Sequence, residues 1–444
     1  MNKHLKICMM TNTYLPHVGG VARSVATFAE EFRKKRHDVL VVAPEFAQPE
    51  GAPAIQEKNV VRLPALQQFN GSDFSVRLPI AGFFNDAIDA FQADIIHSHH
   101  PFLLGDTAVR IAASKHVPVI FTHHTLYEDY THYVPGDSPA LKQFAIELST
   151  RYANLCDGVI APSESIAELI KSRGVEVPIK VIPTGIDVKG FSSGDGKAFR
   201  AANNISSDDF VVGHLGRLAA EKNLTFLCRA VCRFLKKEPA AVFLIVGTGP
   251  MEKEIRAIFR AKGLAKRLFM PGKKTGQELF DAYAAMDVFA FSSFSETQGM
   301  VIAEAMAAGL PVIALDASGV REVVENEKNG FLLDGKTGEE EFAACLEKIK
   351  TDTGLHVQLK AGAQLTGQKF SKERSAKKAL KFYEEILKLT RPQLSVEKEE
   401  LWASLKKRIE VEWKLISDKA ECAIKALTSD VKEEETPKKE AALV

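Results

Sequence analysis

The chain has 444 residues, of which 45% are hydrophobic and 26% are charged, which is an ordinary globular composition. Single hydrophobic cores stop growing at about 250–300 residues, so this length predicts two domains. The 58 Lys and Arg side chains nearly balance the 57 Asp and Glu, giving a net charge of +1. This balance excludes the broad positive field of a dedicated nucleic-acid-binding protein.

The cysteines and the apolar runs indicate the cellular setting. Six cysteines are scattered along the chain and form neither a disulfide framework nor a two-pair zinc pattern. Residues 1–16 contain too short an apolar stretch for a signal peptide, and no run approaches the roughly 18 apolar residues that a membrane-spanning helix needs. We therefore expect a cytoplasmic protein.

Short apolar runs alternate with longer amphipathic segments in both halves of the chain. Strands are predicted at 5–10, 38–43, 93–98, 117–122, 156–161 and 179–183, and again at 210–216, 241–247, 287–292 and 310–315. Helix-length segments lie between the later strands, at 223–237 and at 297–309, where Gly309 and Pro311 end the second. Such alternation is typical of a doubly wound parallel α/β sheet. The Gly- and Ser-rich stretch 186–197 separates the halves, which predicts two Rossmann-like domains, 1–185 and 186–370.

The C-terminal segment 393–444 differs in character, because acidic and basic residues are mixed along it. Eight apolar residues spaced three or four apart predict one stripe on a long helix. They are Leu401, Leu405, Ile409, Trp413, Ile416, Ala420, Ile424 and Leu427. The stripe predicts self-docking or self-association through 395–428, with a membrane surface as the alternative, and the end of the chain is expected to be disordered.

Two glutamates eight residues apart flank the start of the segment 297–309. Glu296 follows a predicted strand, and Glu304 lies inside the next helix. Ligands bind outside the carboxyl ends of the strands in open α/β sheets, where the first amides of a helix favour phosphate. We expect Glu304 to accept hydrogen bonds from a ribose and Glu296 from a second sugar. The alternative is a pair of solvated charges. The amides expected at the phosphate are those of Gln298, Gly299, Met300 and Val301.

The Glu296 to Glu304 spacing, with EAMAAGLPV after it, resembles the hallmark of the retaining GT-B glycosyltransferases of family 4. The resemblance runs from about residue 9 to residue 383, through motifs that occur in the family's order. Among them are VGGV at 18–21, DIIHSHHP at 94–101, IPTGID at 182–187 and GRLAAEKN at 216–223. It implies an acceptor-binding N-terminal domain and a nucleotide-sugar-binding C-terminal domain that face a cleft. It also implies a helix over 371–392 that returns to the N-terminal domain.

Charged and glycine residues near two strand ends fit the phosphates of such a donor. Arg217 and Lys222 stand where a strand passes into a helix, so their cations can converge on a diphosphate and stabilise its growing charge. The sequence has no Asp-x-Asp triplet, so we expect these cations to act without a metal or other cofactor. Gly19 and Gly20 follow the first strand and would admit phosphate or acceptor, although a plain strand-to-helix turn is the alternative.

Histidines are dense in the first half, at 97, 99, 100, 116, 123, 124 and 132. The resemblance implies that His124 contacts the donor sugar near the reacting carbon, where an imidazole can bind a hydroxyl and stabilise positive charge. His97 and His99, two apart on a predicted strand, leave open a zinc-dependent hydrolase, although no further ligand is clearly supplied.

The segment 124–137 carries an aromatic cluster and looks like the bacterial enzymes that glucosylate diacylglycerol. Its candidate acceptor-binding residues are Tyr127, Glu128, Tyr130, His132 and Tyr133. Tyrosines suit the boundary between bilayer and water. The alternative is an aromatic loop packed on its own domain.

Together these patterns lead us to expect a retaining enzyme that moves a hexose, glucose by resemblance, from a UDP-sugar to diacylglycerol at the inner face of the membrane. A soluble acceptor, such as a sugar phosphate or a polysaccharide, is the first alternative. A zinc-dependent hydrolase and a non-catalytic nucleotide-binding module are the others.

Overall fold

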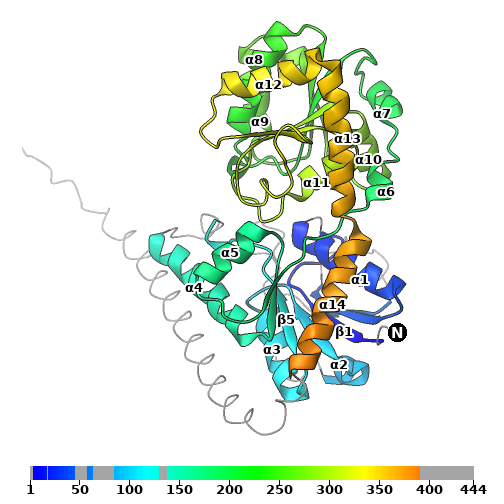
Figure 1. The fold of residues 1–444 in the computed structure, drawn as a ribbon, viewed down its shortest axis with the longest axis vertical. Helices are drawn as coiled ribbons and strands as arrows, with labels where there is room; N and C mark the ends of the chain where they lie inside the picture. Colours follow the sequence, from blue (N-terminus) through cyan, green and yellow to red (C-terminus); the bar gives the residue numbers. More distant parts are fainter. Residues whose placement is uncertain (1–3, 18, 46–57, 64–84, 130–137, 391–444) are drawn as a thin grey trace, which may run out of the picture.

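The computed structural model describes residues 4–17, 19–45, 58–63, 85–129 and 138–390. Two α/β domains lie one above the other in Figure 1, the first coloured blue to cyan and the second green to yellow. The consecutive helices α13 (Thr353–Lys369) and α14 (Lys372–Thr390) run from the second domain onto the first (Figure 1).

The first domain is built on a parallel sheet in the order β3-β2-β1-β4-β5-β6-β7. Its central strands are apolar and buried on both faces, as expected where helices cover both sides of a sheet. The strands are β1 (Lys6–Met10), β2 (Asp38–Pro44), β3 (Val60–Leu63), β4 (Ile95–Ser98), β5 (Val119–Thr122), β6 (Gly158–Ala161) and β7 (Ile179–Val181). The helices are α1 (Gly20–Lys34), α2 (Asn85–Phe91), α3 (Leu104–Lys115), α4 (Pro139–Leu155) and α5 (Glu164–Ser172).

The second domain has a parallel sheet in the order β10-β9-β8-β11-β12-β13. Its strands are β8 (Phe210–Leu215), β9 (Ala241–Val246), β10 (Leu268–Gly272), β11 (Val288–Phe291), β12 (Val312–Leu315) and β13 (Gly330–Leu333). Its α-helices are α6 (Val188–Phe191), α7 (Gly196–Ala202), α8 (Leu224–Lys237), α9 (Glu252–Ala261), α10 (Gly276–Ala284), α11 (Met300–Ala307) and α12 (Glu339–Thr351), besides α13. Short 3-10 turns lie at Ala220–Lys222 and Ala265–Arg267.

Helix α14 belongs to the core of the first domain although it follows the second. Seven of its side chains pack with β1 and α1: Ala376, Ala379, Leu380, Phe382, Tyr383, Ile386 and Leu387. Gly158 in β6 provides the space, because a Cβ there would lie 2.8 Å from the ring of Phe382. The chain passes between the domains twice, near Ile186 and near Ser371. An isolated parallel β-bridge between these two residues holds the two connecting segments side by side.

The predicted fold class, two doubly wound parallel α/β domains, is confirmed. The strands expected from apolar runs all form, with ends shifted by one or two residues. Three further strands, β3, β10 and β13, were not predicted from the sequence. Each lies at an edge of its sheet, β3 in the first and the other two in the second, and β10 is half-buried along its whole length. An edge strand needs less continuous apolar character than a central one, and its pattern is therefore weaker.

Candidate active site

The loop from β11 to α11 is bonded directly to the first domain. Thr297 Oγ1 donates a hydrogen bond of 2.9 Å to the carbonyl of His124, and Ser163 Oγ donates one of 2.7 Å to the carbonyl of Thr297. The Gln298 amide pairs with the backbone of Thr184, accepting from its N–H at 2.7 Å and donating to its carbonyl at 2.8 Å. These bonds place the strand-end histidine of one domain beside the Glu296 loop of the other.

Lys222 and Glu296 come together in this loop, as their predicted roles at one donor require. Lys222 Nζ lies 2.7 Å from Glu296 Oε1, and the two side chains are 18% and 16% exposed. Ser292 at the end of β11 donates to the carbonyls of Lys222 and Asn223, which fixes the turn after β8 against this strand. Partial burial makes the charges of such a pair more effective than they are in open water.

Arg217 lies at the same strand end but further toward solvent. Its side chain is 51% exposed and forms a loose ion pair with Glu221, at 3.4 Å. Arg217 stands two residues after Leu215, the last residue of β8. Among the described residues, Lys222 is the cation that contacts the Glu296 carboxylate, whereas Arg217 faces Glu221.

Glu304 lies inside the helix that follows Glu296, as the sequence predicts. It is fully buried in α11, where Arg23 of α1 forms an ion pair with one carboxylate oxygen. Tyr283 Oη donates a hydrogen bond of 2.8 Å to the other. The neighbouring carboxylate raises the pKa of the Arg23 guanidinium above its ordinary value. Sequence reasoning missed Arg23, although it stands one turn after Gly19 and Gly20 at the start of the first helix.

The helix that follows Glu296 begins later than predicted. α11 starts at Met300, and Gly299 before it adopts the left-handed conformation with φ of 68°. Gln298 therefore lies in the loop before the helix, and its side chain bonds to the backbone of Thr184 in the first domain. The amides of Met300 and Val301 do lie in the first turn of the helix, where α11 carries positive partial charge.

The two glycines after β1 differ in their surroundings. A Cβ on Gly19 would lie 2.8 Å from the His17 imidazole, whereas one on Gly20 would meet no atom of a described residue within 4 Å. Neither residue has a positive φ. Open space at the first residue of α1 is compatible with a ligand that approaches the backbone there.

His124 is half-buried and adjoins a cluster of buried imidazoles at the ends of β4 and β5. His124 Nε2 lies 2.9 Å from His99 Nδ1, and the two rings are nearly parallel. Burial holds the pKa of both imidazoles well below their usual range. Burial also lowers the pKa of His97 and His100 to about 3 and of His123 to about 4. The cluster is therefore neutral at physiological pH.

The zinc-dependent hydrolase finds no support at these histidines. Both nitrogens of His97 are engaged within the protein, Nε2 by Thr122 at 2.6 Å and Nδ1 by Tyr383 of α14 at 2.7 Å. His100 Nδ1 accepts from the backbone of Asn12. Across the residues that the structure describes, no group of three or more His, Cys, Asp or Glu side chains is arranged to hold a metal ion.

The candidate acceptor segment is only partly described. Tyr127 packs edge-on against Phe102 and near His123, so this ring does lie on its own domain. Glu128 forms an ion pair with Arg173 at the end of α5. Tyr130, His132 and Tyr133 lie outside the described residues, as does the predicted stripe of 395–428.

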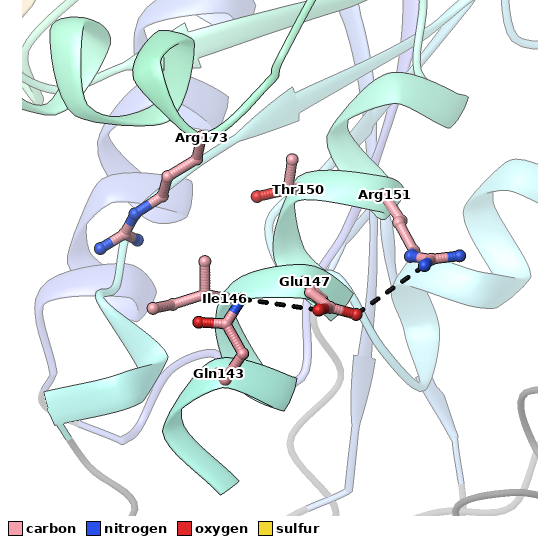
Figure 2. A pocket seen from close by; sticks show the side chains of 6 residues that line it. All are labelled: Gln143, Ile146, Glu147, Thr150, Arg151 and Arg173. Carbon is pink, nitrogen blue, oxygen red and sulfur yellow. Dashed lines mark hydrogen bonds and ion pairs between the residues drawn. The ribbon is translucent and has the colours of Figure 1, made fainter. Parts of the chain in front are cut away.

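A groove on the first domain adjoins this segment. It is lined by five residues of α4 and by Arg173, the partner of Glu128 (Figure 2). Gln143 and Arg151 both contact Glu147 on the helix surface (Figure 2). The groove contains none of the predicted donor-binding residues. In the described ranges no helix is both long and apolar enough to cross a bilayer.

Comparisons with known proteins agree with this geometry. Residues 18–189 match the model of Glycosyltransferase Family 4, and residues 195–366 match that of Glycosyl transferases group 1. An alpha-monoglucosyldiacylglycerol synthase of Acholeplasma laidlawii is 27% identical over 86% of this chain and 98% of its own length. A GDP-mannose-dependent alpha-mannosyltransferase of Corynebacterium glutamicum is 26% identical over 90% of this chain and 95% of its own.

Among solved structures, Anabaena HepE in complex with UDP-glucose has a TM-score of 0.63 at 22% identity, covering 89% of this chain and all of that one. This likeness concerns the fold. The two family models together span most of the chain, one for each domain, and their order is that of the two sheets. The resemblance seen in the sequence motifs is thereby confirmed, and the chain belongs to the GT-B glycosyltransferases of family 4.

Proposed function

We propose that this glycosyltransferase moves glucose from UDP-glucose to diacylglycerol with retention of configuration at the anomeric carbon. The observation that carries the proposal is the convergence of His124 from the first domain with Lys222 and Glu296 from the second, joined through Thr297. A donor sugar bound there would have three protein groups close by. They are the Glu296 carboxylate, which can accept hydrogen bonds from its hydroxyls, the Lys222 ammonium and the His124 imidazole. The relative in Acholeplasma laidlawii, matched over nearly its whole length, supports the choice of sugar and lipid.

Lys222 and Arg217 serve the diphosphate in this proposal. Lys222 is held beside Glu296, and the half-exposed guanidinium of Arg217 is accessible to an incoming phosphate. The first turn of α11 adds the amides of Met300 and Val301. A UDP-glucose complex of the same fold supports a uridine donor.

Glu304 receives the ribose hydroxyls only if Arg23 gives up its present contact. Arg23 and Tyr283 each hold one carboxylate oxygen and the carboxylate has no exposed surface, so a ribose reaches it only when Arg23, the more exposed of the two partners, moves. Arg23 lies one turn into α1, close in sequence to Gly20. We infer that nucleotide binding moves Arg23 away from Glu304.

The transfer itself needs no separate base. The bond from the anomeric carbon to the β-phosphate oxygen breaks, and its electron pair stays on that oxygen. The acceptor hydroxyl oxygen bonds to the carbon from the same face, and its proton passes to the departing phosphate oxygen, giving UDP and the glycoside. Lys222 and Arg217 stabilise the negative charge on the phosphate, and Glu296 holds the sugar hydroxyls.

The acceptor enters, in this proposal, beside the segment 124–137, which puts the enzyme at the inner face of the membrane as a peripheral protein. Tyr127 and Glu128 would support that segment from within the first domain, since both are held by packing or an ion pair. Protein cations take the place of Mg²⁺ in the proposal, so transfer should persist in a chelator.

The test is a transfer assay with radiolabelled UDP-glucose and diacylglycerol in mixed micelles, with and without EDTA, counting label in the organic phase. Diacylglycerol-dependent label that Glu296→Gln lowers by about 100-fold would support donor and acceptor together. GDP-mannose in parallel tests the specificity named for the Corynebacterium relative. If label passes only to a sugar phosphate or glycan, the soluble-acceptor alternative replaces the lipid. UDP binding without any turnover would leave a non-catalytic module.

A further inference from the structure

The imidazoles of His99 and His124 are hydrogen-bonded to each other, so the position of the proton on one ring determines its position on the other. The 2.9 Å separation between His99 Nδ1 and His124 Nε2 is a hydrogen bond, and such a bond needs one N–H and one bare nitrogen. Both rings are neutral, since burial keeps the pKa of each well below its usual range. A neutral imidazole carries one proton. The pair therefore has two arrangements, and the tautomer of one ring decides that of the other.

The second nitrogen of each ring distinguishes the two arrangements. His99 Nε2 is buried with no hydrogen-bond partner in the described part of the chain. If His124 Nε2 carried the shared proton, the proton of His99 would sit on this Nε2 and be left as a buried, unpaired donor. If His99 Nδ1 carries it, Nε2 is only an unused acceptor. Proteins leave buried N–H groups unpaired less often than acceptors.

We propose that His99 is a positioning residue that fixes the proton of His124 on Nδ1. His99 Nδ1 then donates to His124 Nε2. The His124 side chain is half-buried, and its Nδ1–H makes no hydrogen bond to a described residue. This N–H is the group that a ligand could use. The role rests on the proposed function, because the donor offers mainly oxygen acceptors to such an N–H.

The surroundings keep His99 in place for this task. The His97 ring, with both nitrogens bonded to Thr122 and Tyr383, lies 4.0 Å from the His99 ring between centroids. On the other side, the carbonyl of His124 is tied to Thr297 of the second domain. The imidazole pair is thus held from both domains, and its tautomer is set before any substrate binds.

The experiment is ¹⁵N NMR of the full-length protein with ring-labelled histidine at pH 8, where long-range ¹⁵N–¹H correlations distinguish the two tautomers. His124 is identified among the 12 histidines by the signal lost in His124→Asn. The expected wild-type result is a protonated Nδ1 and a bare Nε2. A proton on Nε2 overturns the proposal, and this measurement needs no substrate, so a failed lipid assay does not bear on it.

Two nearly isosteric variants test the cause. His99→Asp offers only an acceptor at the Nδ1 position, so we expect the proton of His124 to move to Nε2 and kcat to fall more than tenfold, with KM for UDP-glucose within about twofold. His99→Asn retains a donor, and should keep the Nδ1–H tautomer and kcat within a few-fold. An unmoved proton in His99→Asp, or a moved proton with unchanged kcat, overturns the positioning role. If His99→Asp does not fold, the wild-type spectrum and His99→Asn decide.

Discussion

Arg23 in α1 and Glu304 in α11 form an ion pair between the two domains, and the carboxylate in it has no exposed surface. The Tyr283 hydroxyl completes its hydrogen bonding. A buried carboxylate that loses its cation keeps the full cost of its desolvation. This pair therefore matters for stability as well as for the ribose.

Removing the cation should destabilise the protein. We expect Arg23→Met to lower the free energy of unfolding by about 2 kcal/mol, less than the ~3–5 kcal/mol of a fully buried pair because the Arg23 side chain is 32% exposed. Urea denaturation measures the difference. The matched control is Arg229→Met, whose pair with Glu339 is exposed and should contribute under about 0.5 kcal/mol. Equal effects of the two variants would contradict the importance of the domain contact.

Glu296 should be needed for transfer and not for folding. Glu296→Gln keeps the shape but removes the charge beside Lys222, and we expect kcat/KM to fall by about 100-fold, in the range of a lost polar contact to a transition state. The melting temperature should stay within a few degrees. Glu339→Gln, at the exposed pairs of α8 and α12, is the control for charge removal. Full activity in Glu296→Gln would remove this residue from the site.

Arg217 should contribute to nucleotide affinity. Its side chain is 51% exposed, so Arg217→Ala should change stability by less than about 1 kcal/mol while weakening UDP binding about tenfold, as loss of one charged contact predicts. Isothermal titration calorimetry with UDP gives the affinity. Arg233→Ala on α8, with a similarly exposed side chain, should bind UDP like the wild type. Unchanged affinity in Arg217→Ala would show that its guanidinium points elsewhere.

Gly20 should tolerate a methyl group structurally but not functionally. A Cβ there meets no atom of the residues that the structure describes within 4 Å, and alanine favours the helix by up to about 1 kcal/mol, so Gly20→Ala should be as stable as the wild type or slightly more so. UDP-glucose binding should weaken, because the open space is proposed to be used by the ligand. Gly338→Ala is the control, since this N-cap of α12 is equally open and lies outside the proposed site. Wild-type affinity in both variants would leave Gly20 as a plain turn residue.

The buried imidazoles should make the fold sensitive to mild acid. Burial lowers the pKa of His97 and His100 to about 3 and of His214 to about 4, from an ordinary value of 6.5. The unfolded chain therefore binds more protons below pH 6.5, so their contribution to stability is complete above that pH. It declines as pH falls toward 4, by about 1.4 kcal/mol per unit for each histidine. Urea denaturation between pH 7.5 and 5 measures the slope.

A single substitution measures the contribution of one histidine, His214, to this pH dependence of stability. His214→Asn keeps a donor for the Ala290 carbonyl, which His214 Nδ1 faces at 3.0 Å, but carries no titrating ring. The slope below pH 6.5 should fall by the contribution of one histidine. An unchanged slope would mean that His214 is not neutral in the folded protein.

Much of the fold follows from local sequence, because central strands of a parallel sheet must be apolar on both faces. β8, β9, β11 and β12 are visible for this reason. The edge strands β3, β10 and β13 are not, since they lack a neighbour on one side and their short sequences carry no such requirement. Helix α11 was predicted too early because a helical period does not show that Gly299 adopts a left-handed conformation before Met300.

The contacts of the candidate site could be predicted from the sequence only for polar side chains that directly follow neighbouring strands. Glu296 and Lys222 follow β11 and β8, which are neighbours in the sheet, so their meeting is a consequence of strand order. The ion pair of Glu304 with Arg23 does not follow from the strand order. Arg23 lies 281 residues away in another domain, and nothing in its local sequence shows that the two domains touch there. The same holds for His99 and His124, whose contact depends on rotamers.

Helix α14 also sets an order for biosynthesis. The first domain needs side chains such as Phe382 and Tyr383 in its core, yet the ribosome makes them only after the whole second domain. At about 5–20 residues per second, the stretch from β7 to α14 takes roughly 10–40 s to translate. During that time the domain that emerges first exposes an uncovered apolar face, while the second can already close its own sheet. The domain translated first thus completes its folding last.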